Sequence, residues 1–192
     1  MNITTIITAS LFLMSALFVS PSLSPAMAAG WQIDEARSKV HFTYTRDGVS
    51  ERGSFAKFKG SADFDADQPT AARLELSIAT ASIALADKLA QGLATSAEWF
   101  DSRNHPDAAF QLTSLSQQDE TRYAAEGVLT IRGELKKIML PVDLEIKENH
   151  ATASGRLTIV RKDYQLGFGP SAIFVEIGPE VFVDFTLVAR KL

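Results

Sequence analysis

The chain has 192 residues, a formal net charge of −4 and no cysteine. This mildly acidic balance argues against nucleic acid as a partner, because a basic surface supplies most of the affinity for nucleic acid. Without cysteine there are no disulfides and no thiolate metal sites, so the hydrophobic core alone must stabilise the fold.

The first segment has the pattern of a secretory signal peptide. The run from Ile6 to Val19 is almost all apolar but too short to span a bilayer comfortably as a helix. A small-x-small cleavage pattern, Ala26-Met-Ala28, follows it, although no Lys or Arg precedes the apolar run. We therefore expect a signal peptide over residues 1–28 and one domain over residues 29–192.

The rest of the chain alternates apolar and polar residues with a period of two. Alternation of this kind is typical of strands with one buried and one solvated face, as in antiparallel sheets. About eight short strands separated by turn-forming residues favour a sandwich or an up-and-down barrel. Pro141 falls on the outward face of a strand, so it is expected at an edge or a bulge. The predicted strands, in chain order, are Val40–Tyr44, Ser54–Phe64, Arg73–Ile78, Ala109–Ser116, Arg122–Ile131, Ile138–Lys147, Ala153–Arg161, Ile173–Ile177 and Val181–Ala189.

One segment departs from this alternation. Leu85, Leu89 and Leu93 recur every four residues in an alanine-rich stretch, which is helical spacing. We expect a short helical insertion around residues 85–100 that partly covers the mouth of a barrel.

The sequence contains no motif typical of catalysis or of metal binding. His41, His105 and His150 lie far apart without metal-ligand spacing, and solvated histidines are the favoured interpretation. No nucleophile elbow, zinc-protease motif or phosphate-binding glycine loop is present. We therefore predict no metal site and no catalytic residue.

Aromatic residues are the positive signal. Core packing accounts for half or more of them, but a barrel of about eight strands can hold one small ligand when its own side chains leave the interior open. The sequence alone leaves open whether the interior is filled or hollow.

Several short motifs run in order through the domain. They are Trp31-Gln-Ile-Asp34 with Ser38-Lys-Val-His-Phe42, Gly53-Ser-Phe-Ala-Lys-Phe-Lys-Gly60 with Phe64-Asp65, Ser82-Ile83, Glu98-Trp-Phe-Asp101 with His105-Pro106 and Phe110, Gly127-Val-Leu-Thr-Ile-Arg-Gly133, Arg161-Lys-Asp-Tyr-Gln-Leu-Gly167, and the strand from Val181. In this order and spacing they resemble the YceI-like family of exported lipid-binding proteins.

The resemblance implies an all-β fold, an antiparallel eight-stranded lipocalin-like barrel whose long apolar cavity takes isoprenoid chains such as quinones or polyprenyl lipids. It also implies a periplasmic location, no cofactor other than a bound lipid, frequent homodimers, and an association with membrane b-type cytochromes. Many members carry Asp-x-His-Leu before a Phe-Phe-Asp motif. Here Gln91-Gly92-Leu93 stands at that place and Trp99 replaces the first Phe, so a head-group role of that histidine does not carry over.

We predict a periplasmic carrier of an isoprenoid lipid or quinone. The alternatives are an accessory partner of a membrane b-type cytochrome or quinol system, and an enzyme acting on such a lipid. By alternation and aromatic content, the predicted wall residues are Phe42, Tyr44, Phe55, Phe58, Leu76, Ile78, Leu89, Leu93, Trp99, Phe100, Phe110, Leu129, Ile131, Ile138, Leu140 and Tyr164. The predicted head-group contacts are Arg132, Arg161 and Lys162.

Overall fold

The computed structural model describes residues 29–65, 68–170 and 175–192. The predicted signal peptide (1–28) and the first residues of the predicted strand Ile173–Ile177 lie outside these ranges. The strands are β1 (Ala29–Ile33), β2 (Lys39–Arg46), β3 (Val49–Phe55), β4 (Phe58–Phe64), β5 (Arg73–Ala79), β6 (Ile83–Leu85), β7 (Asp107–Gln117), β8 (Arg122–Ile131), β9 (Glu134–Lys147), β10 (His150–Val160) and β11 (Ile177–Lys191). The helical segments are α1 (Lys88–Ala94) and the short 3-10 turns η1 (Pro69–Ala71), η2 (Thr80–Ser82) and η3 (Arg161–Tyr164).

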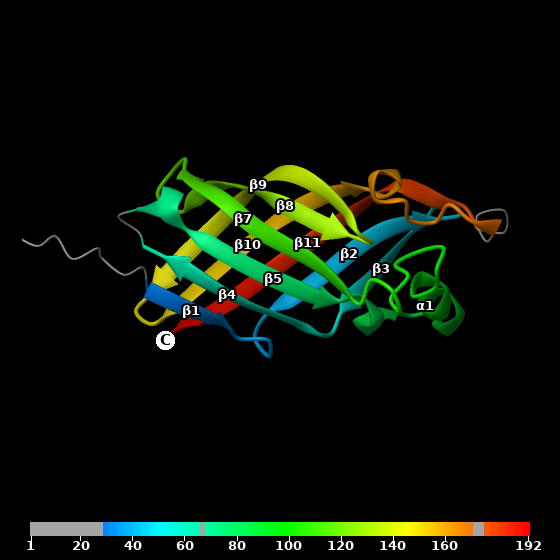
Figure 1. The fold of residues 1–192 in the computed structure, drawn as a ribbon, viewed down its shortest axis with the longest axis horizontal. Helices are drawn as coiled ribbons and strands as arrows, with labels where there is room; N and C mark the ends of the chain where they lie inside the picture. The colour runs from blue at the N-terminus through cyan, green and yellow to red at the C-terminus, as the bar shows by residue number, and fades with distance from the viewer. Residues whose placement is uncertain (1–28, 66–67, 171–174) are drawn as a thin grey trace, which may run out of the picture.

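The strands form one antiparallel sheet that closes on itself (Figure 1). Its circuit runs β1-β4-β5-β7-β8-β9-β10-β11, and pairing of β11 with β1 closes it. The long strand β11 pairs with β1 near its C-terminal end and with β2 over the rest of its length. β2 pairs with β3, and β3 pairs with β6. These three strands extend the wall of the barrel beyond the strands β1, β4 and β5. The expected antiparallel eight-stranded lipocalin-like barrel is confirmed.

Strand boundaries differ from prediction where tertiary contacts interrupt the ladder. The predicted strand Ser54–Phe64 is two strands, because the backbone N–H of Ala56 donates to the carbonyl of Ser82 (3.1 Å) and that of Lys57 to the hydroxyl of Ser82 (3.1 Å). β1 and β6 were not predicted as strands. β11 starts at Ile177, so residues 175 and 176 are not part of a strand.

The helical insertion is present but shorter than expected. Only Lys88–Ala94 is helical, and the side chain of Asp87 caps it by accepting from the N–H groups of Leu89 (2.8 Å) and Ala90 (3.3 Å). Residues 83–85 pair as β6 because Ile83 is buried against the barrel, and the segment after α1 forms turns. No helix among the described residues has the length and hydropathy needed to cross a bilayer.

Pro141 lies at a local edge of the barrel, as predicted. It pairs with Ala124 of β8, whereas the pairing of β9 with β10 ends one residue later, at Val142 and Gly155. The missing N–H of proline therefore costs no ladder hydrogen bond on the β10 side.

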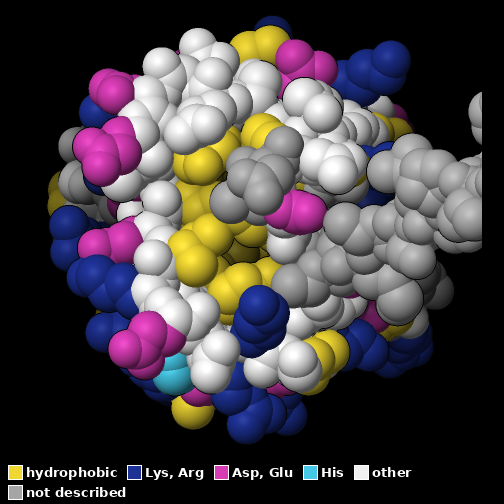
Figure 2. Space-filling view, turned by 90° about the vertical axis from the view of Figure 1, so that its left-hand side faces the viewer, with side chains coloured by type: hydrophobic (Ala, Val, Ile, Leu, Met, Phe, Trp, Pro, Cys, Tyr) yellow, Lys and Arg dark blue, Asp and Glu magenta, His cyan; other side chains and the backbone are white. Residues whose placement is uncertain are grey.

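The two ends of the barrel differ. The helix end carries α1, η3, the β2–β3 turn and the β8–β9 turn, and the open end carries the C-terminus and the β7–β8 and β9–β10 turns (Figure 1). Figure 2 views the open end, which is hollowed, with hydrophobic side chains lining the hollow.

Candidate functional site

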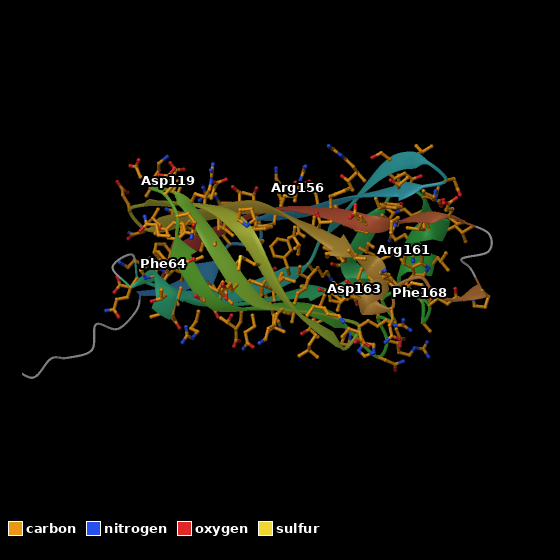
Figure 3. The ribbon with its side chains drawn as sticks, turned by 90° about the horizontal axis from the view of Figure 1, so that it is seen from above. Phe64, Asp119, Arg156, Arg161, Asp163 and Phe168 are labelled. Carbon is orange, nitrogen blue, oxygen red and sulfur yellow. The ribbon has the colours of Figure 1, made fainter. Side chains whose placement is uncertain are left out.

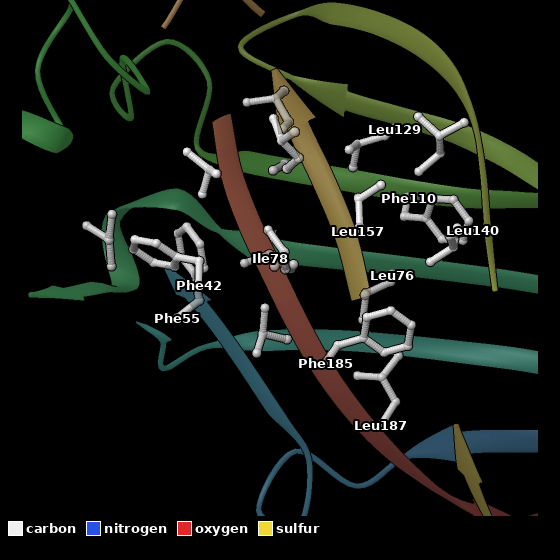
Figure 4. Close-up of a pocket in the computed structure, with 18 of the residues that line it drawn as sticks. Phe42, Phe55, Leu76, Ile78, Phe110, Leu129, Leu140, Leu157, Phe185 and Leu187 are labelled. Atoms are coloured by element: carbon white, nitrogen blue, oxygen red, sulfur yellow. The ribbon is translucent and has the colours of Figure 1, made fainter. Parts of the chain in front are cut away.

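The barrel encloses a cavity of about 400 Å³. Side chains from strands all around the barrel point into it (Figure 4), and its wall reaches from Phe64 and Leu144 near the open end to Arg161 and Ile177 at the helix end. Among the described residues, the charged side chains of the wall are Arg46, Arg73, Asp87 and Arg161. The space is therefore long and apolar, with polar groups confined to its two ends.

Short side chains at inward positions keep the interior open. An eight-stranded barrel is only just wide enough for its own side chains to fill it. Alanine at many inward positions leaves the centre unfilled, which answers the question that the sequence left open. These alanines are Ala62, Ala72, Ala108, Ala125, Ala151, Ala153 and Ala189.

Most of the predicted wall residues line this cavity. Their contact with a ligand stays a prediction. The lining residues among them are Phe42, Tyr44, Phe55, Leu76, Ile78, Leu89, Leu93, Trp99, Phe100, Phe110, Leu129, Ile131, Ile138 and Leu140, together with the predicted head-group contact Arg161.

Four predicted residues lie outside the wall. Phe58 is buried in a cluster with Trp31, and Tyr164, the last residue of η3, is buried in a cluster with Leu129 and Ile131 of β8, so neither lines the cavity. Arg132 donates to the backbone carbonyls of Gln165 and Ala97 outside the barrel, and Lys162 is exposed. Neither side chain is part of the cavity wall.

Sequence reasoning missed a second group of lining residues. For the last predicted strand, Val181–Ala189, the signal was the alternation itself, because Val181, Val183, Phe185 and Leu187 share one face and line the cavity. The missed large residues are Trp31, Ile33, Val40, Phe64, Leu74, Ile83, Leu85, Leu112, Leu115, Val142, Leu144, Leu157, Ile159, Leu166, Val175, Ile177, Val181, Val183, Phe185 and Leu187.

Aromatic rings cluster toward the helix end. The ring of Phe55 lies 5.4 Å from that of Phe42 and 5.7 Å from that of Phe100, the second pair edge to face. Such pairs add rigidity as well as apolar area. They provide a firm wall where the cavity meets α1.

A polar cluster ties α1 to β2. Arg46 lies 3.0 Å from Asp87 and 3.0 Å from Glu51, and the hydroxyl of Tyr44 donates to Glu51 at 2.6 Å. Burial, followed by the hydrogen bond to Glu51, raises the pKa of the Tyr44 phenol well above its usual value. The hydrogen bond from Arg46 and the helix N–H groups lower the pKa of Asp87. The single positive charge of Arg46 is therefore shared by two carboxylates.

Replacing Asp87 by alanine is expected to loosen α1, because the helix loses its cap and its link to Arg46 at once. Amide hydrogen exchange over residues 88–94 should accelerate. Since the pKa of Asp87 is lowered in the fold, its contribution is complete above about pH 4, the value of an unfolded aspartate, and is lost as pH falls through the lowered pKa.

The matched control for this prediction is Asp143→Ala, which removes an exposed partner of Arg122 near the open end. Exchange in α1 should not change in this variant. Equal exchange of α1 in Asp87→Ala and in the unmodified protein at pH 7 would contradict the anchoring role.

Arg161 occupies the wall at the helix end (Figure 3). Its guanidinium donates to the carbonyls of Gly178 (2.9 Å), Leu166 (2.8 Å) and Ile177 (2.7 Å), with a longer contact to Gly167 (3.4 Å). It lies over the rings of Trp99 (5.7 Å) and Phe168 (5.5 Å), and burial lowers its pKa.

Gly167 allows this packing. Its φ is +75°, and a Cβ there would stand 2.6 Å from the Trp99 ring. Only glycine combines this backbone conformation with such a close approach.

At the open end the charged wall residue is Arg73. Its guanidinium donates to the carbonyls of Ala71 (3.1 Å) and Ala72 (2.8 Å), and the residue is exposed. It is therefore solvated, unlike Arg161.

Within the described ranges, no three His, Asp or Glu side chains gather in a way that could hold a metal ion. His41 and His150 are exposed, and the half-buried His105 lies against the β8–β9 turn at Gly133.

Comparison with known proteins agrees with this geometry. The YceI-like domain, as a family pattern, matches residues 31–189. A UPF0312 protein of Azotobacter vinelandii is 30% identical over 118 residues, which cover 60% of this chain and 62% of that protein, slightly under two thirds of its length. The crystal structure of Burkholderia cenocepacia BcnA is 28% identical with a TM-score of 0.75, covering 81% of this chain and 98% of that one.

A second solved structure shares the fold. It is a domain from Saccharophagus degradans, described as a polyisoprenoid binding domain implicated in plant cell wall breakdown. The two chains are 17% identical with a TM-score of 0.70, and the match covers 86% of this chain and 99% of that one. With the family pattern spanning nearly the whole barrel, this chain belongs to the YceI-like family.

Proposed function

We propose that this chain is an exported, periplasmic carrier of a long isoprenoid-type lipid, a quinone or a polyprenyl lipid, held lengthwise in the barrel. The observation that carries the proposal is the apolar cavity of about 400 Å³ that extends between the two ends of the barrel. Its volume falls within the range of about 300–1,000 Å³ for small-molecule sites. The Saccharophagus domain of the same fold, described as binding polyisoprenoid, supports the choice of ligand class, and the signal-peptide pattern of residues 1–28 supports export.

The physical basis is burial of a hydrocarbon chain. Each buried methylene contributes about 0.8 kcal/mol, so a chain of many carbons binds tightly without polar contacts. Affinity then depends on the length of chain that the cavity accepts, and selection among lipids depends on the few polar groups in the wall.

Mass spectrometry of an organic-solvent extract tests the proposal. Protein purified from its native periplasm should yield one polyprenyl lipid or quinone in near-stoichiometric amount, and the emptied protein should take up a dansyl- or NBD-labelled isoprenoid that the extracted lipid displaces. An empty extract together with no uptake of the labelled isoprenoid would overturn the proposal.

Binding is favoured over catalysis by the placement of the carboxylates. Among the described residues, Asp87 is the one carboxylate in the cavity wall. It accepts hydrogen bonds from Arg46 and from the N–H of Leu89 at the start of α1. Asp101, the last residue of the Glu98-Trp-Phe-Asp101 motif, accepts from the amide of Asn104 (2.9 Å) and lies outside the wall. Substrate turnover abolished by Asp101→Asn without loss of binding would revive the enzyme hypothesis.

The homodimer and the membrane cytochrome partner stay predictions from the family resemblance. Crosslinking in the native membrane fraction followed by co-purification tests both.

A further inference from the structure

Large hydrophobic side chains are exposed to solvent at the helix end of the barrel. They are Leu89 of α1, Leu135 beside the β8–β9 turn, Phe168 after η3 and Val49 at the start of β3. The elements that carry them make up the helix end (Figure 1). Exposed hydrophobic side chains that occur singly are normal, but several gathered at one end of a molecule indicate an interaction surface. We call these four residues the apolar rim.

The turns at the open end are polar instead. Residues 118–120 of the β7–β8 turn and residues 148–149 of the β9–β10 turn are all exposed, and Asp119, Glu120 and Glu148 are among them. The exposed large hydrophobic side chains of this end are Leu192, at the C-terminus, and the partly exposed Ile146. The two ends of the barrel therefore offer different surfaces to a partner.

The elements that carry the apolar rim are tied to one another. Arg46 of β2 forms an ion pair with Asp87 at the start of α1 (3.0 Å). Arg132 in the β8–β9 turn donates to the carbonyl of Gln165, which follows η3, and to that of Ala97, which follows α1. The exposed side chains therefore belong to one connected surface rather than to independent loops.

The apolar rim is continuous with the cavity. Leu89 is 84% exposed and yet lines the cavity, and the next residue of α1, Ala90, lines it as well. A lipid chain that leaves the cavity past α1 thus moves along apolar side chains to the outer surface. Hydrocarbon loses its favourable burial if it then enters water. The partner that suits this surface is therefore itself apolar at its contact face.

Lysines lie beside the apolar rim. Lys88 precedes Leu89, Lys136 follows Leu135, and Lys162 lies in η3, and all three lysines are exposed. None of them forms a salt bridge within the described part of the chain. A lysine can lay its apolar stem along a membrane and place its ammonium among lipid phosphates. Apolar side chains flanked by such lysines suit a bilayer surface.

We infer that the helix end docks on a lipid bilayer, with the apolar rim among the acyl chains and the neighbouring lysines among the lipid phosphates. Lipid then passes between the bilayer and the cavity past α1 without crossing water. The inference rests on the proposed function, because the choice of partner depends on the cavity that reaches the surface at Leu89. It adds the partner and the face of the barrel that meets it.

Single fluorophores test which face docks. Because the chain has no cysteine, one introduced cysteine at a time can carry NBD, whose emission rises in an apolar environment. The labelled, emptied mature protein is mixed with vesicles of phosphatidylethanolamine and phosphatidylglycerol. Emission should rise in Leu135→Cys and Phe168→Cys and stay constant in Met139→Cys and Leu192→Cys. A rise only in Leu192→Cys would mean that the open end docks, and no rise at any position would exclude a bilayer as the partner. Either result would overturn the inference.

A matched pair of serine variants measures the contribution of the apolar rim. Leu135 and Met139 both lie on β9 and are both 66% exposed, so the two substitutions remove similar apolar surface. Leu135→Ser should weaken binding to the same vesicles, measured by flotation, by about tenfold. Met139→Ser should bind vesicles like the unmodified protein. Equal binding by the two variants would refute the docking role of the apolar rim.

Transfer of a labelled isoprenoid separates docking from carriage. Neither Leu135 nor Met139 lines the cavity, so both serine variants should take up the isoprenoid from solution like the unmodified protein. Transfer from vesicles should accelerate as vesicle concentration rises, because it occurs on contact, and Leu135→Ser should slow it. If the unmodified protein takes up the isoprenoid from solution but does not bind vesicles, only the docking inference fails. If it binds vesicles but takes up no isoprenoid, the carrier function fails.

Discussion

Phenylalanine in place of Ala153 is expected to weaken lipid binding strongly and leave the barrel folded. Ala153 lies on β10, lines the cavity, and pairs with Leu187 and Leu144 on the neighbouring strands. A larger side chain forced into a packed core costs about 1–3 kcal/mol, but here the ring enters open space. Thermal unfolding should therefore occur at the same temperature or higher.

The loss of binding follows from the volume that the ring occupies. A ring at this position, toward the open end of the cavity, excludes three or four methylenes of the lipid, at about 0.8 kcal/mol each, so affinity should fall by about 100-fold. Displacement of a labelled isoprenoid measures this change.

The matched control is Ala124→Phe. Ala124 alternates with the buried Tyr123 and Ala125 on β8 and does not line the cavity. This variant should bind lipid like the unmodified protein. If Ala153→Phe fails to fold while Ala124→Phe folds, the interior is packed rather than hollow and the carrier function loses its basis.

The positions of most strands and their inward faces could be predicted from the sequence, because the alternation of apolar and polar residues is a local property. Along β9, Ile138 and Leu140 were assigned to the inward face, and both line the cavity. Phe58 shows the limit of the method. It was predicted to line the cavity, but it is 5% exposed and packs in a cluster with Trp31 and Leu76. Periodicity predicts which face of a strand a side chain occupies, but it does not predict whether the side chain reaches the cavity.

Breaks in strands and the roles of charges depend on contacts distant in sequence. The interruption at Ala56 and Lys57 exists because Ser82 supplies hydrogen-bond partners from another segment. Arg132 and Arg161 looked equivalent in sequence, but Arg132 ties loops together outside the barrel while Arg161 enters its wall. No short-range pattern separates these two environments.

The hollow interior itself was also beyond local prediction. Alanine is compatible with both a tightly packed barrel and an open one, and only the closed barrel shows that the inward alanines line unfilled space. The family resemblance supplied this expectation, and the geometry of the barrel explains it.

Arg161→Gln is expected to reduce the free energy of unfolding by at least about 3 kcal/mol, because three bonds from a charged donor to Gly178, Leu166 and Ile177 are lost and each such bond contributes about 1.5–3 kcal/mol net of exchange with water. These bonds join the loop after η3 to the first residues of β11. Urea unfolding followed by circular dichroism measures the change.

Two controls separate this role from charge alone. Arg156→Gln removes an arginine whose side chain is 66% exposed and pairs with Asp184 on the surface, so its effect should be far smaller. Arg161→Lys keeps the charge but cannot reach several carbonyls at once, so its stability should fall between those of the unmodified protein and Arg161→Gln. Unmodified stability in Arg161→Gln would mean that the carbonyls are equally well satisfied by water, and the guanidinium would then be free to serve the ligand alone.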